Sequence, residues 1–260
     1  SVTGVQTCAL PISAGPHAQI MEQVKKVAEK QGLKIQVVEF SDYVQPNAAL
    51  AAGDLDANSY QHKPYLDAQV KDRGYPFAVA ANTVIFPIGL YSKKVKKLAD
   101  LKEGARFGIP NDPTNGGRVL LLLQDQGLIK LKPNAGLKAT PLDVIENPKK
   151  LRFFEIEGPQ LIRALDDLDL VVVWPSYFVN AGKKAQASQA LLYSGIADTF
   201  YAMGFVARSD RAQDAKLRKL VQLYQNSEAV RQTISQAFGN DPKLYTLPWQ
   251  QTPKEASHGK

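Results

Sequence analysis

The sequence predicts an α/β protein with two lobes, each a mixed sheet flanked by helices. Short apolar strands alternate with helical segments along the 260 residues, and this alternation is typical of mostly parallel sheets with helices on their faces. The length suffices for two lobes of ordinary domain size. Because no low-complexity linker divides the chain, we expect the lobes to be joined by strands that cross from one to the other.

Helical periodicity and glycine stops define the elements of the first part of the chain. Positions 18–31 repeat apolar residues at helical spacing, and Gly32 is suited to end that helix. Pro64 suits the first turn of another helix, which runs to about Gly74. The other elements predicted here are a strand over 35–40, a short helix over 47–53 and a brief strand over 54–58.

Apolar runs define the elements of the rest of the chain. The run 84–92 predicts a long strand interrupted by Pro87, and the leucine-rich run 119–123 predicts a buried helix over 116–126. Asp169–Trp174 is typical of a fully buried strand. We also expect strands over 106–110 and 200–207, helices over 161–165, 214–224 and 228–238, and a disordered polar tail over 250–260.

Composition argues against nucleic-acid and membrane-spanning classes. The net charge is +7, but Lys and Arg are spread along the chain, without a basic amphipathic helix, zinc-finger spacing or aromatic RNA-binding motif. We therefore expect a solvated basic surface and no nucleic-acid partner. No apolar run approaches the roughly 20 residues of a membrane helix. A single cysteine, Cys8, cannot form an internal disulfide and does not decide the compartment.

Residues 1–13 differ from the rest because they carry no charge. A secretory signal would begin with a basic stretch and a longer apolar core. The segment resembles a translated sequencing adapter, and we predict a non-native leader fused to a truncated gene, with the native signal missing. The alternative is a short native strand built on Cys8, Leu10 and Ile12. Amplifying the locus from source DNA distinguishes the two.

The first candidate binding segment follows the strand predicted over 54–58. It places Tyr60, His62 and Tyr65 where a strand passes into a helix, and ligands of open α/β sheets bind beyond the carboxyl ends of the strands. Tyrosine offers an apolar face with a hydrogen-bonding tip. The alternative is that both tyrosines fill the core and His62 is a structural histidine.

The second candidate segment opens the helix that follows the strand over 106–110. Thr114 or Asn115 can cap this helix, and Gly116 and Gly117 would let a ligand approach the backbone. Exposed N–H groups and the helix dipole favour an anion there, and Arg118 can hold a carboxylate with two hydrogen bonds. The alternative is a capped helix start with a solvated arginine.

A third segment begins at Trp174, just beyond the buried strand, and its aromatic residues either line a cleft or fill the core. Motifs of catalysis are missing from the sequence: it has no Gly-x-Ser-x-Gly elbow, no His-Glu-x-x-His and no cluster among its three histidines. The acidic group around Asp167 is typical of a solvated turn. We expect no catalytic residue, metal or cofactor, with an enzyme or a ligand-sensing regulator as the competing hypotheses.

Taken together, these segments resemble the MetQ/NlpA family of methionine-binding lipoproteins from about Ala14 to Trp249. The stretches that carry the resemblance are Phe40-Ser-Asp-Tyr-Val-Gln-Pro-Asn47, Gly53-Asp-Leu-Asp-Ala-Asn-Ser-Tyr-Gln-His-Lys-Pro-Tyr65, Pro110-Asn-Asp-Pro-Thr-Asn-Gly-Gly-Arg118 and Leu142-Asp-Val-Ile-Glu-Asn-Pro148. The resemblance implies a type II periplasmic-binding-protein fold and a monomer that is lipid-anchored in the periplasm or cell envelope. It further implies delivery of methionine-like ligands to an ABC permease with ATPase subunits.

We expect one lobe to hold residues 14–87 and 204–249 and the other to hold residues 88–203. The strands that cross between them are expected over 84–91 and 200–206. The lobes are expected to close around the ligand by hinge motion. The resemblance also implies the roles of individual residues. In the first lobe, a side-chain pocket is formed by Tyr43, Tyr60, His62 and Tyr65. In the second, Asn115 and Arg118 meet the polar end of the ligand, with Arg118 on its carboxylate.

The chain departs from the family pattern at two positions expected in the site. Trp174 and Met203 stand where family members usually carry asparagine. A buried ammonium without polar partners costs several kcal/mol, which a cation–π contact with Trp174 can offset in part. Asn180 is a substitute if the chain shifts locally. We therefore predict methionine as the ligand, with a methionine derivative, a short peptide or another small carboxylate as the alternative.

Overall fold

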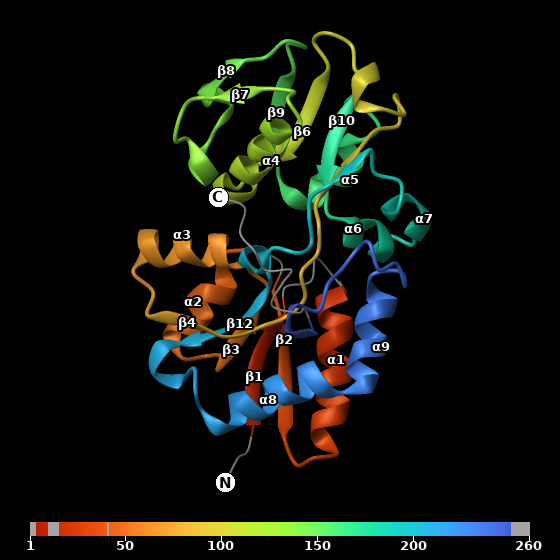
Figure 1. The fold of residues 1–260 in the computed structure, drawn as a ribbon. Coiled ribbons are helices and arrows are strands. Elements are labelled where there is room, and N and C mark those ends of the chain that lie inside the picture. Colours follow the sequence, from red (N-terminus) through yellow and green to blue (C-terminus); the bar gives the residue numbers. More distant parts are fainter. Residues whose placement is uncertain (1–3, 10–15, 41, 251–260) are drawn as a thin grey trace. The chain divides into compact units, whose positions relative to one another are not determined.

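The computed structural model describes residues 4–9, 16–40 and 42–250, so that all but Gln250 of the predicted tail lies outside the described residues (Figure 1). The chain divides into two compact units. Unit 1 comprises Ser1–Phe86, Val179–Lys184 and Gly195–Lys260, and unit 2 comprises Pro87–Phe178 and Ala185–Ser194. Both units are mixed α/β, as the sequence predicts. No helix in the described part of the chain is both long and apolar enough to cross a bilayer.

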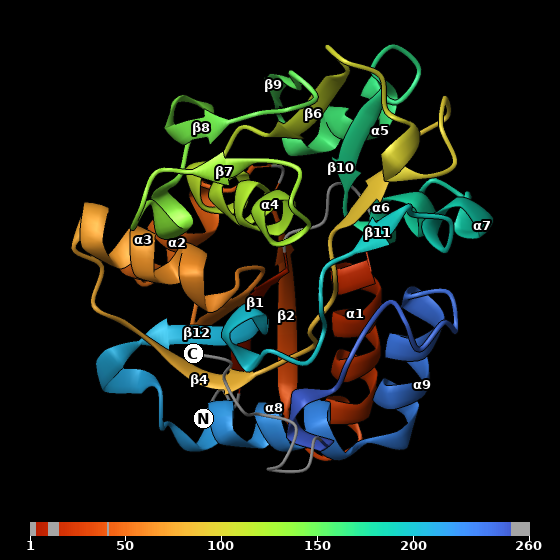
Figure 2. The same cartoon turned by 45° about the horizontal axis from the view of Figure 1, so that its top comes forward.

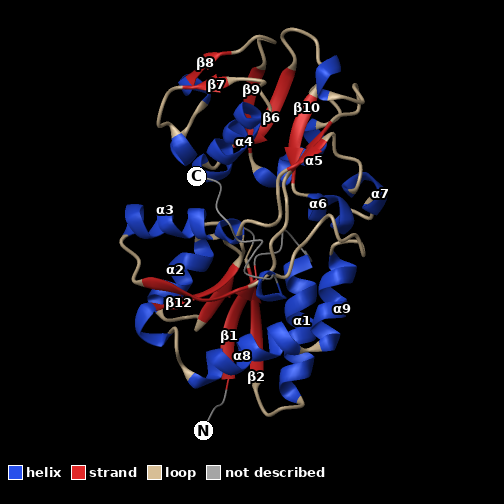
Figure 3. Ribbon diagram, in the orientation of Figure 1, coloured by secondary structure: helices blue, strands red, loops and turns tan. Residues whose placement is uncertain are grey.

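Unit 1 is built on a five-stranded sheet in the order β2-β1-β3-β12-β4 (Figure 3). The strands are β1 (Gly4–Ala9), β2 (Lys34–Glu39), β3 (Ala57–Ser59), β4 (Phe77–Asn82) and β12 (Gly204–Arg208). The first three are parallel to one another, and β12 is antiparallel to both β3 and β4. A strand from late in the chain thus lies between two strands from its first third.

Strand β1 falls within the segment predicted as a non-native leader. Its backbone pairs with β2 and β3, with Cys8 opposite Val38 on one side and Asn58 on the other. Of the residues named for the alternative, a short N-terminal strand, Cys8 lies in β1, whereas Leu10 and Ile12 lie outside the described residues.

Helices cover both faces of the sheet of unit 1. They are α1 (Pro16–Glu29), α2 (Gln45–Ala52), α3 (Lys63–Arg73), α8 (Ala215–Asn226) and α9 (Glu228–Ala237). Neighbouring side chains of β12 point to opposite faces: Val206 packs with Leu50 of α2 and Leu66 of α3, while Phe205 packs edge-on against Tyr224 of α8. Helices α1, α8 and α9 contact one another on the Phe205 side.

All three glycines predicted to end helices in this unit are confirmed, and Gly32 lies in the turn after α1 with φ 77°. Gly53 follows α2 with φ 87° and Gly74 follows α3 with φ 70°, the left-handed conformation that glycine adopts without steric cost.

The strand predicted over 84–92 is wrong in its extent. Only β5 (Gly89–Tyr91) is a strand, while Ile85 forms an isolated bridge with Thr246. Pro87 has no N–H to donate to a ladder, and the chain passes from unit 1 to unit 2 at this residue. The apolar run reflects burial by tertiary contacts, with Val84, Ile85 and Ile88 all fully buried.

Unit 2 contains a second five-stranded sheet, in the order β11-β5-β10-β6-β9. Its other strands are β6 (Arg106–Pro110), β9 (Arg152–Ile156), β10 (Leu170–Val173) and β11 (Leu192–Tyr193), with a separate pair of β7 (Lys130–Leu131) and β8 (Val144–Glu146). The helices are α4 (Pro113–Asp125), α5 (Leu161–Ala164), α6 (Pro175–Asn180) and α7 (Lys184–Ala187). The end of α6 and the first residue of α7 belong to the segment Val179–Lys184 of unit 1. Helix α4 lies beside β6 and β7 (Figure 2). Strand β10 is fully buried, as predicted.

We expect His17 to make the stability of unit 1 depend on pH. The residue is half-buried in the first turn of α1, with its ring 5.6 Å from the ring of Phe86, and desolvation there lowers the pKa of the imidazole to about 4. Between that value and the ordinary pKa of about 6.5 the unfolded chain binds the proton and the folded chain does not. We expect stability to be full above pH 6.5 and to fall by about 2–3 kcal/mol as the pH drops toward 4.

Urea unfolding at about pH 7 and about pH 4.5 measures this effect as a difference between the wild type and His17→Phe. Carboxylates contribute equally to both proteins, so the difference isolates His17. An identical loss of stability in the two proteins would contradict the assignment.

Candidate functional site

Three predicted tyrosines meet at one backbone oxygen in unit 1. The hydroxyls of Tyr60 and Tyr65 both donate to the carbonyl of Tyr43, at 3.1 and 3.0 Å. The ring of Tyr65 lies 6.5 Å from that of Tyr43 and 6.0 Å from that of Tyr60, measured between centroids. Tyr60 is buried, and the other two are half-buried. Side chains from the end of β3, the first turn of α3 and the segment before α2 therefore form one aromatic cluster.

His62 caps helix α3 beside this cluster. Its Nδ1 accepts a hydrogen bond from the Tyr65 N–H at 3.1 Å, so a neutral ring carries its proton on Nε2. The ring packs edge-on against Tyr201, 6.1 Å away. The Nδ1 of His62 therefore has a structural role, as the alternative interpretation of this histidine predicted.

Met203 lies directly beside His62, through an antiparallel backbone bridge between the two residues. The Met203 N–H donates to Val84 O at 3.0 Å, and its carbonyl accepts from Thr83 N at 2.7 Å. The side chain is 6% exposed. The predicted strand over 200–207 begins only at Gly204, because Thr199–Tyr201 forms a 3₁₀ turn capped by Asp198.

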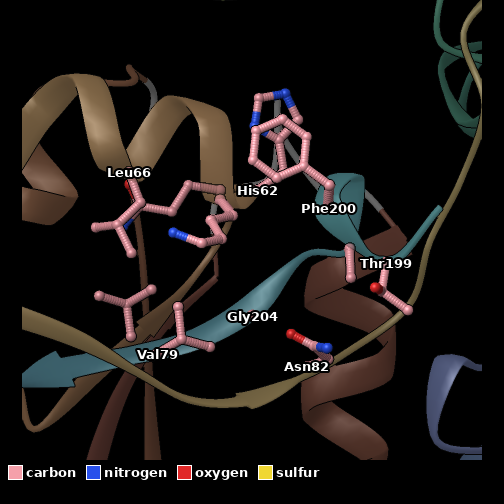
Figure 4. Close-up of a pocket in the computed structure, with 11 residues that line it drawn as sticks. His62, Leu66, Val79, Asn82, Thr199, Phe200 and Gly204 are labelled. Atoms are coloured by element: carbon pink, nitrogen blue, oxygen red, sulfur yellow. The ribbon is translucent and has the colours of Figure 1, made fainter. Parts of the chain in front are cut away.

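A pocket of about 460 Å³ opens next to His62 in the same unit (Figure 4). Its volume falls in the range of roughly 300–1,000 Å³ typical of small-molecule sites. Leu66 and Val79 give it an apolar side, while Asn82 and Thr199 supply polar groups. No acidic side chain is among the lining residues, which are Gln61, His62, Lys63, Leu66, Val79, Asn82, Thr199, Phe200, Ala202, Gly204 and Val206.

Arg118 is a buried cation in unit 2. It lies in α4 with 6% of its surface exposed, and its Nη2 donates to Ser194 Oγ at 3.3 Å. Ser194 Oγ also accepts from the Ile88 N–H at 2.9 Å. Ser194 could not be predicted from the sequence, because nothing local to it indicates a partner 76 positions away.

The cap of α4 corrects a prediction. Helix α4 begins at Pro113, and the side chain of Asp112 caps it by accepting from the backbone N–H and the Nδ2 of Asn115, each at 3.0 Å. Neither Thr114 nor Asn115 is the cap, because proline is well suited to the first helical position, so the helix begins earlier in the chain, at Pro113. Burial raises the pKa of the Asp112 carboxyl, against the lowering effect of the Asn115 hydrogen bonds.

Gly117 also has a different role from the predicted one. A Cβ there would lie 2.7 Å from the carbonyl carbon of Leu137 and would overlap its oxygen. The backbone that approaches Gly117 is therefore the protein's own, in the 3₁₀ turn Gly136–Lys138. Gly116 is less crowded, because a Cβ added there would lie 3.2 Å from Pro110 O.

Trp174 follows strand β10 and is 8% exposed. Its ring lies 5.5 Å from that of Tyr177, and its carbonyl accepts from the Tyr177 N–H at 2.9 Å. Asn180, the proposed substitute, is exposed at the end of α6.

Each unit brings its own predicted residues to one place. In unit 2, β6 and β10 are parallel neighbours, so the start of α4 and Trp174 both lie beyond the carboxyl edge of the sheet, where α/β proteins bind ligands. In unit 1, Tyr43 follows β2, the residues Tyr60, His62 and Tyr65 follow β3, and Met203 directly precedes β12. Within the described residues, no group of three or more His, Cys, Asp or Glu side chains forms a metal site.

Solved structures with this fold define the class. The chain resembles an ABC transporter periplasmic substrate-binding protein from Coxiella burnetii, with a TM-score of 0.82, 41% identity and coverage of 91% of this chain and 97% of that one. A nutrient-binding protein from Burkholderia cenocepacia, solved bound to methionine, gives a TM-score of 0.83 and 46% identity over 90% of this chain and 97% of that one. The chain thus has the two-lobed fold of periplasmic substrate-binding proteins.

The chain belongs to the NlpA lipoprotein family, which matches residues 9–244. Among its relatives is the D-methionine-binding lipoprotein MetQ of Escherichia coli K12, 46% identical over 222 residues that cover 84% of this chain and 80% of the relative. The family predicted from the sequence is confirmed.

Proposed function

We propose that this protein is the substrate-binding component of an ABC importer and that it captures methionine or a related amino-acid-like carboxylate. The observation that carries the proposal is its 46% identity to a nutrient-binding protein solved with methionine, together with relatives named D-methionine-binding lipoproteins. The protein passes its ligand unchanged to a membrane permease with ATPase subunits. It acts as a monomer, lipid-anchored at the cell envelope in its native form.

In this proposal, the two units contribute different chemistry to ligand binding. Unit 1 offers the apolar side chain of the ligand an aromatic surface made by Tyr43, Tyr60, His62 and Tyr65. Unit 2 offers its carboxylate the guanidinium of Arg118, which is buried and able to make two parallel hydrogen bonds. Asn115 lies one turn away on α4 and supplies an amide.

A second candidate function keeps the transport role and changes the ligand. Trp174 and Met203 are buried and apolar at positions expected to contact the ligand's ammonium group. An ammonium left without polar partners binds poorly, so a carboxylate that lacks one fits these residues better.

Calorimetry and thermal-shift measurements with the full chain, stripped of ligand by unfolding and refolding, test both functions. We expect L- or D-methionine to raise the melting temperature by mass action, and methioninol, which lacks the carboxylate, to have no effect. The 2-oxo acid analogue, which lacks the ammonium, is the matched probe for the second candidate. A response to the oxo acid but none to methionine would favour that candidate, and no response to any carboxylate would reject both.

A further inference from the structure

Three buried amide side chains form a closed hydrogen-bond network in unit 1. Asn47 and Asn58 are 0% exposed and Gln61 is 3% exposed. Asn47 lies in α2, Asn58 lies in the middle of β3, and Gln61 lies between β3 and α3. The network therefore ties together the three segments that carry the aromatic cluster and His62.

The hydrogen bonds fix every amide in one orientation. Asn47 Oδ1 accepts from Asn58 Nδ2 at 2.9 Å and from Gln61 Nε2 at 2.7 Å, and Asn47 Nδ2 donates to Gln61 Oε1 at 3.0 Å. Gln61 Nε2 also donates to Asn58 Oδ1 at 3.0 Å, and Asn58 Nδ2 to Pro46 O at 3.2 Å. Turning any one amide over would set donor against donor and acceptor against acceptor, so the network has a single arrangement.

Apolar packing is available in the same layer. Leu50 of α2, Leu55 between α2 and β3, Leu66 of α3 and Val206 of β12 form a hydrophobic cluster. Apolar side chains hold elements together without the desolvation cost of buried amides, but they specify relative position less strictly than a fully satisfied network does. The amides are therefore better explained by a need for fixed geometry than by stability.

The geometry that they fix is that of the proposed ligand surface. Gln61 lies between Tyr60 and His62 in the chain, and its backbone carbonyl accepts from Gly204 N at 3.2 Å, next to Met203. Asn47 lies four residues after Tyr43, whose carbonyl receives both tyrosine hydroxyls. A shift of any one amide would move one of these residues relative to the others.

We infer that Asn47, Asn58 and Gln61 are positioning residues that hold Tyr60 and His62 in the geometry required for ligand binding. The inference rests on the proposed function for its link to the ligand. It assigns no ligand contact to the amides themselves.

Gln61→Glu is the sharpest test, because it keeps the shape of the side chain and replaces two donors with an oxygen that faces Asn47 Oδ1 and Asn58 Oδ1. We expect its affinity for methionine, measured by calorimetry, to fall at least 20-fold. The control is Ile234→Ala, which opens a cavity on the other side of the sheet, in α9. It should lower the melting temperature by a similar amount and leave the methionine affinity within threefold of the wild type.

Hydrogen exchange of the free proteins supplies a readout that needs no ligand. We expect faster exchange of the amides over 58–65 in Gln61→Glu than in Ile234→Ala, with the rest of unit 1 similar in the two. If Gln61→Glu does not fold, Gln61→Ala, which removes the side chain without opposing oxygens, takes its place. Wild-type affinity in the Gln61 variant, or equal affinity losses in variant and control, would overturn the inference. If the wild type binds no methionine, the proposed function fails, and the exchange comparison alone decides the positioning role.

Discussion

Arg118→Ala is expected to weaken methionine binding roughly 200-fold, or about 3 kcal/mol, which is the usual cost of removing one partner of a buried charge pair. The guanidinium is buried in α4 beyond the carboxyl edge of its sheet, and it is the group that the proposal assigns to the ligand carboxylate. Its Nη2 donates to Ser194 Oγ at 3.3 Å, and the melting temperature of the ligand-free variant checks that unit 2 keeps its fold. Calorimetry of methionine binding measures the effect.

Two matched variants separate carboxylate recognition from a general effect of charge. Arg118→Lys keeps the charge but loses the planar pair of donors, so its affinity should lie between those of the wild type and Arg118→Ala. Arg163→Ala removes an exposed arginine from the same unit and should leave the affinity unchanged. Equal losses in Arg163→Ala and Arg118→Ala would exclude a specific role for Arg118.

Gly117→Ala is expected to destabilise unit 2 by about 3–5 kcal/mol, because the added methyl group meets backbone atoms of Leu137 that no rotamer change can move. Helix α4 or the turn Gly136–Lys138 would have to shift to make room. The gain in helix propensity from Gly to Ala is only about 1 kcal/mol and does not offset this cost. The midpoint of urea unfolding measures the effect.

The neighbouring glycine is the control for this prediction. At Gly116 the nearest atom to a new Cβ is Pro110 O at 3.2 Å, which a movement of a few tenths of an ångström relieves. We expect Gly116→Ala to change the free energy of unfolding by less than about 1 kcal/mol, since propensity and crowding oppose each other. If the two alanine variants have the same stability, the close approach at Gly117 is not a constraint on the fold.

Elements with a strong local signal could be predicted from the sequence. Helices α8 and α9 show a clear apolar periodicity, and β10 is a run of buried aliphatic residues. Strand β4 has no such signal, because Phe-Ala-Val-Ala-Ala-Asn contains three alanines where strands favour branched or aromatic residues. It forms because β12 pairs with it, and no local pattern indicates that partner.

The same distinction applies to the candidate site. The rule that ligands bind beyond strand ends placed Tyr60, Arg118 and Trp174 beside their sheets. The amide network could not be predicted, because Asn47 meets Gln61 across 14 positions and each residue alone is an ordinary polar residue. The capping role of Asp112 does have a local signal, because the proline that follows it favours a helix start one position before Thr114.

The pairing of β5 with β11 sets an order of assembly for the chain. Gly89 lies opposite Tyr193, and the Ile88 N–H is bonded to Ser194 Oγ across 106 positions, so unit 2 brings its own entry and exit points together. Closing a free loop of that length costs roughly 4 kcal/mol of chain entropy by the (3/2)RT ln n rule. Once unit 2 has folded, the contact between Ile88 and Ser194 shortens the effective loop between β4 and β12. We therefore expect β12 to pair with β4, and the sheet of unit 1 to be completed, only after unit 2 has folded.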